Sequence, residues 1–206
     1  MNKFISNLER KFGKYAIPRL PLVMIICYAI GYIMQLINPT VSYFLSLNPY
    51  AILHGQVWRL ISWLLIPPSY SNLFGVLIML YFYYSIGTTL EKTWGTFYYN
   101  YYIFSGIFFT ILASFLLFGY CQIFDSSAIE QTERYYTQYL GQEAPFVYGG
   151  SYYYLTYSLM FSTYYVNMSI FLAFAATYPD MQVLLMFILP IKVKVLGKIG
   201  RASCRE

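Results

Sequence analysis

Charged residues are scarce in this chain. They make up 10% of its 206 residues, against roughly a quarter in soluble domains, whereas hydrophobic residues make up 59%. This composition excludes an ordinary soluble domain and indicates an integral membrane protein. Crossing a hydrocarbon core takes roughly 20 residues, and backbone groups in lipid must be satisfied within a helix. Four stretches are long and apolar enough, namely 20–37, 73–90, 97–118 and 164–178.

Histidine and cysteine are also rare. His54 is the one histidine, and Cys27, Cys121 and Cys204 show neither the spacing of metal ligands nor a paired framework. We therefore expect no cofactor and no metal site. Charged residues occur only at the ends of the expected helices, which gives no support to a small transporter.

Basic residues flank the expected helices on one side of the membrane. They precede the first helix, separate the second from the third, and follow the fourth: Lys3, Arg10, Lys11, Lys14, Arg19, Lys92, Lys192, Lys194 and Lys198. By the positive-inside rule these flanks and the N-terminus are cytoplasmic. Residues 1–19 should form an amphipathic cytoplasmic lead on the bilayer surface. Because the charges track one membrane face, we expect a lipid bilayer and no nucleic acid as partner.

The first apolar run also has the basic start of a secretory signal peptide. No small-x-small cleavage site follows Ile37, and further apolar helices do. The run is therefore expected to remain as a spanning helix.

Two motifs lie on either side of the second expected helix. Trp58 and Arg59 belong to a loop, residues 41–72, that is too apolar to be solvated. The second motif has the spacing Gly-x-x-x-Glu-x-x-x-Gly and consists of Gly87, Glu91 and Gly95. Together these motifs resemble the rhomboid superfamily, which contains intramembrane serine proteases and relatives without the catalytic residues. The resemblance implies a first loop against the outer leaflet, tied together by hydrogen bonds of Arg59.

A third pattern follows the fourth expected helix. The apolar run between Pro179 and Pro190-Ile191-Lys192 is too short to span. It resembles the connection before helix five in bacterial rhomboid-like proteins. The resemblance implies an all-α polytopic bundle, with four of six transmembrane helices in residues 20–198, in a bacterial plasma membrane. Residues 199–206 read like a translated sequencing adapter, which predicts an artefactual tail; a natural polar tail is the alternative.

The second motif carries structural expectations. Gly87 should end the second helix and let another helix approach closely. Glu91 should hydrogen-bond neighbouring backbone or pair with Lys92, because an unpaired carboxylate at the membrane edge is costly. Residues 120–161 should form a long outer connection between the third and fourth helices.

Rhomboid proteases use a Gly-x-Ser-Gly serine at the outer end of helix four, a histidine of helix six, and histidine and asparagine from helix two. The family spacing from Pro179 falls instead on Thr163, Tyr164 and Tyr165. In helix two, the family spacing from Glu91 falls on Gly75 and Met79, and the spacing from Arg59 on Asn72 and Val76. Neither register supplies the pair.

Three serines remain to be weighed. Ser151 follows Gly149-Gly150 and fits Gly-x-Ser, but it lies too far upstream of Pro179 unless helix four begins much earlier. Ser162 is expected to cap or pack a helix. Ser169 is expected to bond a preceding carbonyl within the helix. His54 should be exposed or bonded within the loop rather than act as a base.

The leading hypothesis is therefore a catalytically inactive rhomboid-like protein that binds transmembrane segments of client proteins. The alternative is an active intramembrane serine endopeptidase with a displaced nucleophile, for which Ser151 is the weak candidate. A histidine in helix six of the complete gene would favour the alternative.

Overall fold

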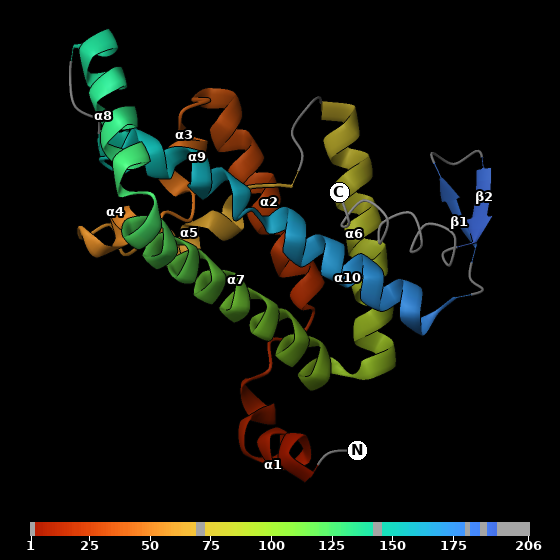
Figure 1. Cartoon of the computed structure of the whole chain (residues 1–206). Coiled ribbons are helices and arrows are strands. Elements are labelled where there is room, and N and C mark those ends of the chain that lie inside the picture. Colours follow the sequence, from red (N-terminus) through yellow and green to blue (C-terminus); the bar gives the residue numbers. More distant parts are fainter. Residues whose placement is uncertain (1–2, 69–72, 142–145, 180–181, 186–188, 193–206) are drawn as a thin grey trace.

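The computed structural model describes residues 3–68, 73–141, 146–179, 182–185 and 189–192 (Figure 1). In this part of the chain, four helical segments are long and apolar enough to cross a membrane: Leu20–Ile37, Leu73–Trp94, Thr96–Phe124 and Tyr152–Thr177. The expected all-α polytopic class is confirmed. A short antiparallel hairpin of β1 (Gln182–Leu185) and β2 (Leu189–Lys192) follows the last helix.

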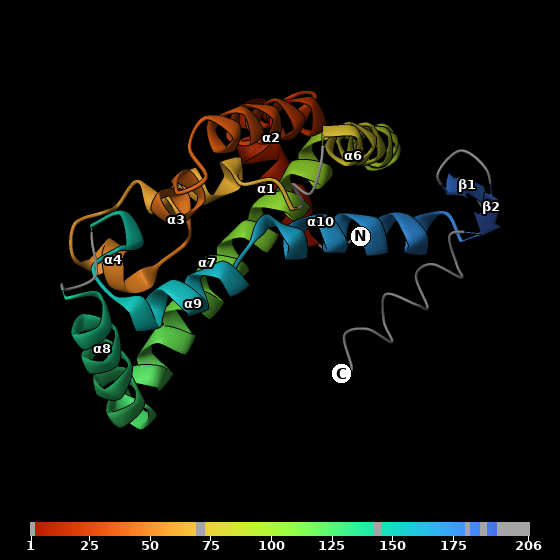
Figure 2. The same cartoon turned by 90° about the horizontal axis from the view of Figure 1, so that it is seen from above.

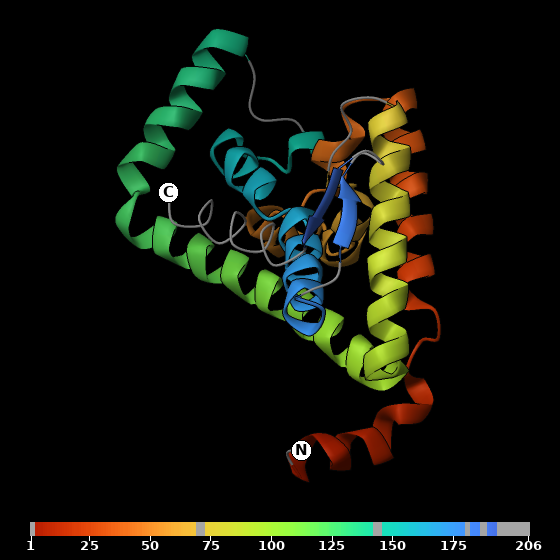
Figure 3. The same ribbon diagram turned by 90° about the vertical axis from the view of Figure 1, so that its right-hand side faces the viewer.

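The long helices form an open bundle. Figure 3 shows α2 (Leu20–Ile37) beside α6 (Leu73–Trp94), while α7 (Thr96–Phe124) slants away from the end of α6. In Figure 1, α10 (Thr163–Thr177) crosses α6, with which it is in contact, and Figure 2 shows α10 on the same side of α7 as α6. Residues from α2, α6, α7, α10 and the first loop share one apolar core: Leu20, Leu47, Ile52, Trp63, Ile86, Leu90, Tyr99, Ile103, Val166, Ile170 and Phe174.

Two glycines allow close approach within this bundle. A Cβ atom at Gly31 of α2 would overlap the carbonyl oxygen of Leu65. A Cβ atom at Gly87 of α6 would lie 2.9 Å from Cβ of Pro21 and 2.9 Å from the Tyr99 hydroxyl oxygen. Small residues at such contacts allow van der Waals packing between helices in lipid.

The first loop is built from short helices. These are α3 (Val41–Leu45), α4 (Pro49–Leu53), α5 (Arg59–Ser62) and the 3₁₀ turn η2 (Trp63–Leu65). Asn48 caps α4 by accepting a hydrogen bond from the Ala51 N–H, and Pro49 occupies the first helical position. The loop is therefore ordered by local capping as well as by the core.

Two boundary expectations are wrong. The second helix does not end at Gly87 but continues to Trp94, because Gly87 is helical and Gly95, at φ 88°, is the residue with backbone freedom to break it. Residues 120–161 are not one loop. They contain the end of α7, then α8 (Ser126–Leu140), the turn η3 (Phe146–Tyr148) and α9 (Tyr152–Met160).

The polar part of that segment forms a helix because its apolar residues repeat on one face of α8. Figure 1 shows α8 continuing from the far end of α7, with α9 beside it. At the opposite end of the chain, the 1–19 lead contains α1 (Lys3–Phe12) and the turn η1 (Gly13–Tyr15). The 199–206 tail lies outside the described residues.

Candidate functional site

The fourth spanning segment is broken in its middle. Helix α9 ends at Met160 and α10 begins at Thr163, with Ser162 extended at φ −101° and ψ 166°. The Ser162 hydroxyl oxygen accepts a hydrogen bond from the Tyr164 N–H at 3.3 Å. Ser162 therefore caps α10, as the sequence predicted. Non-helical backbone at membrane depth is tolerated where protein surrounds it.

The hydroxyls nearest the protease serine position are engaged with backbone. Thr163 is fully buried at 0% exposure, and its hydroxyl donates to the Ile66 carbonyl at 2.6 Å. Six residues further along α10, the Ser169 hydroxyl donates to the Val166 carbonyl at 2.7 Å, as expected for a mid-helix serine. Tyr164 and Tyr165 are exposed on α10. Both the Thr163 and the Ser169 hydroxyl thus donate to a backbone carbonyl rather than to a side-chain base.

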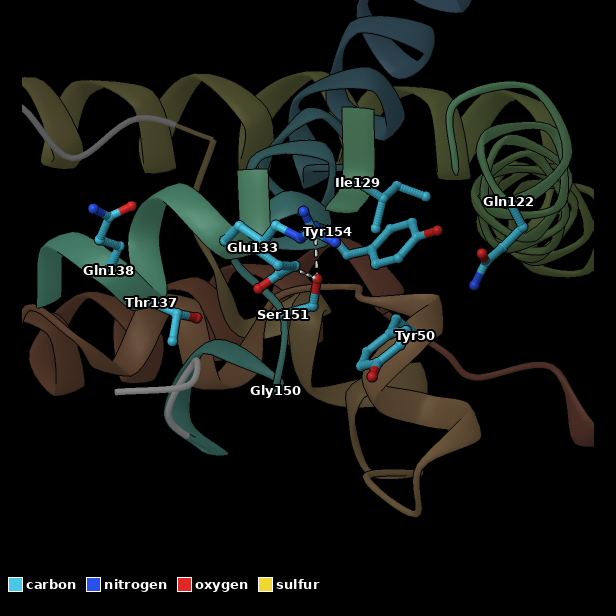
Figure 4. A pocket seen from close by; sticks show the side chains of 10 residues that line it. Tyr50, Gln122, Ile129, Glu133, Thr137, Gln138, Gly150, Ser151 and Tyr154 are labelled. Atoms are coloured by element: carbon cyan, nitrogen blue, oxygen red, sulfur yellow. Dashed lines mark hydrogen bonds between the residues drawn. The ribbon is translucent and has the colours of Figure 1, made fainter. Parts of the chain in front are cut away.

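Ser151 is placed differently from what the sequence suggested. Since the fourth segment begins at Tyr152, Ser151 lies at its first turn, where it caps α9 by accepting from the Tyr154 N–H at 3.3 Å. Its hydroxyl donates to Oε1 of Glu133 at 2.6 Å, and the same oxygen accepts from the Tyr153 N–H at 3.0 Å. Figure 4 shows the Ser151 hydroxyl directed at that carboxylate.

Ser151 lines a cavity of about 720 Å³ between α8, α9 and the first loop. Thr137 and Gln138 of α8 lie on one side of the cavity in Figure 4, and Tyr50 of the first loop and Gln122 of α7 lie on the other. This volume is in the range of small-molecule sites. The cavity therefore combines polar groups from α7 and α8 with an aromatic face.

An imidazole does not reach this serine. Nδ1 of His54 donates to the Tyr50 carbonyl at 2.7 Å, and the His54 ring stacks on the Tyr50 ring at 4.1 Å between centroids. His54 is thus bonded within its own loop, as expected. Serine nucleophiles are ordinarily activated by an adjacent base such as histidine. The contacts of Ser151 are those of a helix cap bound to a carboxylate.

Arg59 joins three segments that are distant in the sequence. Its side chain is 0% exposed and donates to the carbonyls of Tyr43 at 2.6 Å, Ser46 at 3.1 Å and Val147 at 3.2 Å. Nε donates to Oε1 of Gln56 at 2.7 Å. Burial lowers the pKa of Arg59 to about 10, so the guanidinium remains charged at neutral pH. The first loop and η3 are therefore held by one cation.

Trp58 belongs to an aromatic group beside Arg59. Its ring centroid lies 5.4 Å from Phe44 and 5.9 Å from Phe146, and those two rings are 6.1 Å apart. The guanidinium carbon of Arg59 lies 5.7 Å from the Phe44 ring centroid, within cation–π range. Trp58 thus packs beside the Arg59 junction through Phe44.

Glu91 and Asn100 fix the linker before α2. Oε1 of Glu91 accepts from the Arg19 N–H at 2.9 Å, which is the first of the two arrangements expected for this carboxylate. Asn100 accepts from the Ile17 N–H at 3.0 Å and donates to the Ile17 carbonyl at 2.9 Å. Sequence reasoning missed Asn100, although a lone amide inside an apolar helix is a signal for such a contact.

Other residues were also missed. Glu133 gave no signal because its partners lie 18 and 20 residues away in the next helix. Gly31 could have been noticed as a small residue in the middle of the first apolar helix. Of the expected motif, Arg59, Trp58, Gly87, Glu91 and Gly95 all lie at loop junctions or helix contacts, away from the Ser151 cavity.

The fold defines a polytopic helical membrane protein whose first loop is held by Arg59. Residues 19–199 match the family described as eukaryotic integral membrane protein (DUF1751). The chain therefore belongs to that family, which is rhomboid-like. No curated protein and no solved structure matches the chain. The eukaryotic description gives no support to the expected bacterial plasma membrane.

Proposed function

We propose that this protein is a rhomboid-like membrane protein without hydrolytic activity, and that it binds transmembrane segments of other proteins in the bilayer. The observation that carries the first part is the state of the hydroxyls along the fourth segment. Thr163 donates to a backbone carbonyl, and Ser151 caps α9 with no imidazole beside it, because His54 is bonded to the Tyr50 carbonyl. An acyl-transfer nucleophile needs a base that withdraws its proton.

The binding role is supported by apolar surface on two helices that pack together. Leu73, Phe74 and Leu77 on α6 and Tyr164 and Tyr165 on α10 are exposed. In a bilayer these side chains face lipid or another helix. Van der Waals packing drives helix association in lipid, and these exposed side chains are available for such packing against another helix.

We also propose that α1, Lys92 and the linker before α2 face the cytoplasm, with α8 on the opposite side, because the basic residues gather at the first group. Cysteine-accessibility labelling in sealed membranes tests this with Gln131→Cys in α8 and Lys14→Cys before α2, both exposed. Labelling of Gln131→Cys from the cytoplasmic side alone would reverse the topology.

One observation favours the alternative of a serine endopeptidase. The fourth segment begins at Tyr152, so Ser151 occupies its outer end beside a cavity of about 720 Å³. Glu133 is the group to which the Ser151 proton would pass, at 2.6 Å. This reading requires a carboxylate to replace the usual histidine.

The activity test uses the full-length protein with a fluorophosphonate probe and a reporter transmembrane substrate. We expect neither covalent labelling nor cleavage. Labelling and cleavage that both disappear in Ser151→Ala but persist in Ser162→Ala would establish the endopeptidase. The Ser162 variant is the matched control, because both serines cap a helix.

The binding test places a photoreactive amino acid at Leu77 or Tyr165, with Ile33 on the exposed face of α2 as the control position. We expect discrete crosslinks to single-pass membrane proteins at the first two positions and severalfold fewer at Ile33. Equal crosslinking at all three positions would indicate random collisions in the bilayer.

A further inference from the structure

A second cavity, of about 440 Å³, lies where α2 begins and α6 ends. Figure 3 shows these two helix ends meeting beside the start of α7. Arg19, Lys92, Thr88 and Thr96 supply charged and hydroxyl groups to its wall, and Leu22 and Tyr84 supply apolar surface. Both helices are candidate membrane spans, so the cavity lies at the level of lipid headgroups.

The charge of this cavity is positive. Arg19 and Lys92 line it together with one carboxylate, Glu91, of which one oxygen already accepts the Arg19 N–H. Both cationic side chains are exposed, and neither forms an ion pair with a carboxylate among the residues that the structure describes. Two cations and one anion leave a net charge of about +1 to attract an anion.

The cavity wall is held in place before any ligand arrives. Arg19 adopts the left-handed conformation, with φ 57° and ψ 39°, which is uncommon for a residue other than glycine. Two hydrogen bonds between Ile17 and Asn100 and one between Arg19 and Glu91 hold this linker against α6 and α7. Pro21 then packs on Gly87. A fixed wall reduces the ordering that binding requires.

We propose that this cavity binds the phosphate of an anionic phospholipid between Arg19 and Lys92. The Thr88 and Thr96 hydroxyls are additional donors, since phosphate oxygens accept charge-assisted and neutral hydrogen bonds. The acyl chains extend along the exposed sides of α2 and α6 from Leu22 and Tyr84. Basic pockets between transmembrane helices bind lipid headgroups in this way. The proposal is independent of the client-binding role.

A lipid is favoured over a soluble phosphate because the cavity wall has a polar part at Arg19 and Lys92 and an apolar part at Leu22. Leu22 is exposed at the first turn of α2, and Ile26 and Ile30 continue its exposed face toward the membrane interior. Such a face remains unpartnered unless an acyl chain covers it. A free anion would contact only the Arg19 and Lys92 end.

The test is native mass spectrometry of the full-length protein in detergent, titrated with dioleoyl phosphatidic acid or dioleoyl phosphatidylcholine. We expect preferential binding of phosphatidic acid. Arg19→Gln and Lys92→Gln should each weaken it about fivefold, the change expected for one cation near an anionic headgroup. Lys92→Arg should retain binding, and Lys14→Gln, which removes an exposed cation outside the cavity, should leave it unchanged.

Four outcomes would overturn the proposal. Equal binding of phosphatidylcholine would show an apolar groove without charge selection. Equal weakening by Lys14→Gln would show general attraction to a basic surface. Competition by glycerol phosphate at the same concentration as the lipid would show a soluble-anion site. Binding undiminished by Lys92→Gln, in a protein with an unchanged melting temperature, would place the lipid elsewhere. If Arg19→Gln does not fold, Lys92→Gln carries the test alone.

Discussion

Arg59→Ala removes a buried guanidinium that joins the first loop to η3. The side chain donates to the carbonyls of Tyr43, Ser46 and Val147 and to the side chain of Gln56. Each buried acceptor that loses its partner costs about 1–3 kcal/mol, and the more accessible carbonyls lie at the low end because water replaces the donor. Allowing for that, we expect a loss of about 4 kcal/mol in the free energy of unfolding.

The measurement is a thermal melt in detergent. For a chain of this size a loss of 1 kcal/mol lowers the melting temperature by roughly 2–4 °C, so Arg59→Ala should lower it by about 10 °C. Arg134→Ala is the control, because Arg134 is exposed and pairs with Glu130 on the surface of α8, where such pairs contribute at most about 1 kcal/mol. Equal shifts in the two variants would refute the proposed junction.

Arg59→Lys separates charge from geometry. A lysine keeps the positive charge, but its single ammonium group cannot replace the two guanidinium nitrogens that donate to the Tyr43 and Val147 carbonyls. We expect it to recover less than half of the lost melting temperature. Full recovery would show that charge alone stabilises the loop.

The remaining predictions concern the backbone contacts. Gly31→Ala should lower the melting temperature by more than 10 °C or prevent folding, because the alanine Cβ would overlap the Leu65 carbonyl. The control is Gly106→Ala, which should raise the melting temperature slightly because the space around its Cβ is open. Gly95→Ala should cost about 1–3 kcal/mol in the same assay, since φ 88° and ψ 154° suit glycine alone. Asn100→Ala should release the linker before α2 and speed proteolysis near Lys14 at least severalfold, whereas unchanged cleavage would show that Glu91 holds the linker by itself.

The sequence predicts well what depends on local apolarity. The first helix agrees at both ends, 20–37, because basic residues and proline precede it and Asn38-Pro39 follows it. It does not predict the break at Ser162, because the residues on both sides are equally apolar and aromatic. The sequence also predicts a start of helix four that is too late, because the tyrosines of α9 are typical of an interfacial segment. In the structure, however, Tyr152, Tyr153 and Tyr154 are buried.

Contacts between distant segments explain most of what sequence reasoning missed. The Trp-Arg pair could be recognised as a motif, but only the fold shows that Arg59 reaches Val147, 88 residues away. Likewise, Glu133 lies close to Ser151 only because α9 folds back along α8. Apolar runs indicate which segments can cross a membrane, but they leave open which polar groups meet across the bundle.

The first loop braces the fourth segment on both sides of its break. Arg59 holds the Val147 carbonyl just before α9, and Thr163 at the start of α10 donates to the Ile66 carbonyl at the end of the loop. Between them, the hydroxyl oxygens of Ser46 and Ser158 lie 3.2 Å apart. This brace needs the guanidinium, the loop carbonyls and one hydroxyl at Thr163, but no activated serine. The Trp-Arg loop therefore fixes the position of α9 and α10 through contacts that do not involve the Ser151 hydroxyl, which caps α9 and donates to Glu133.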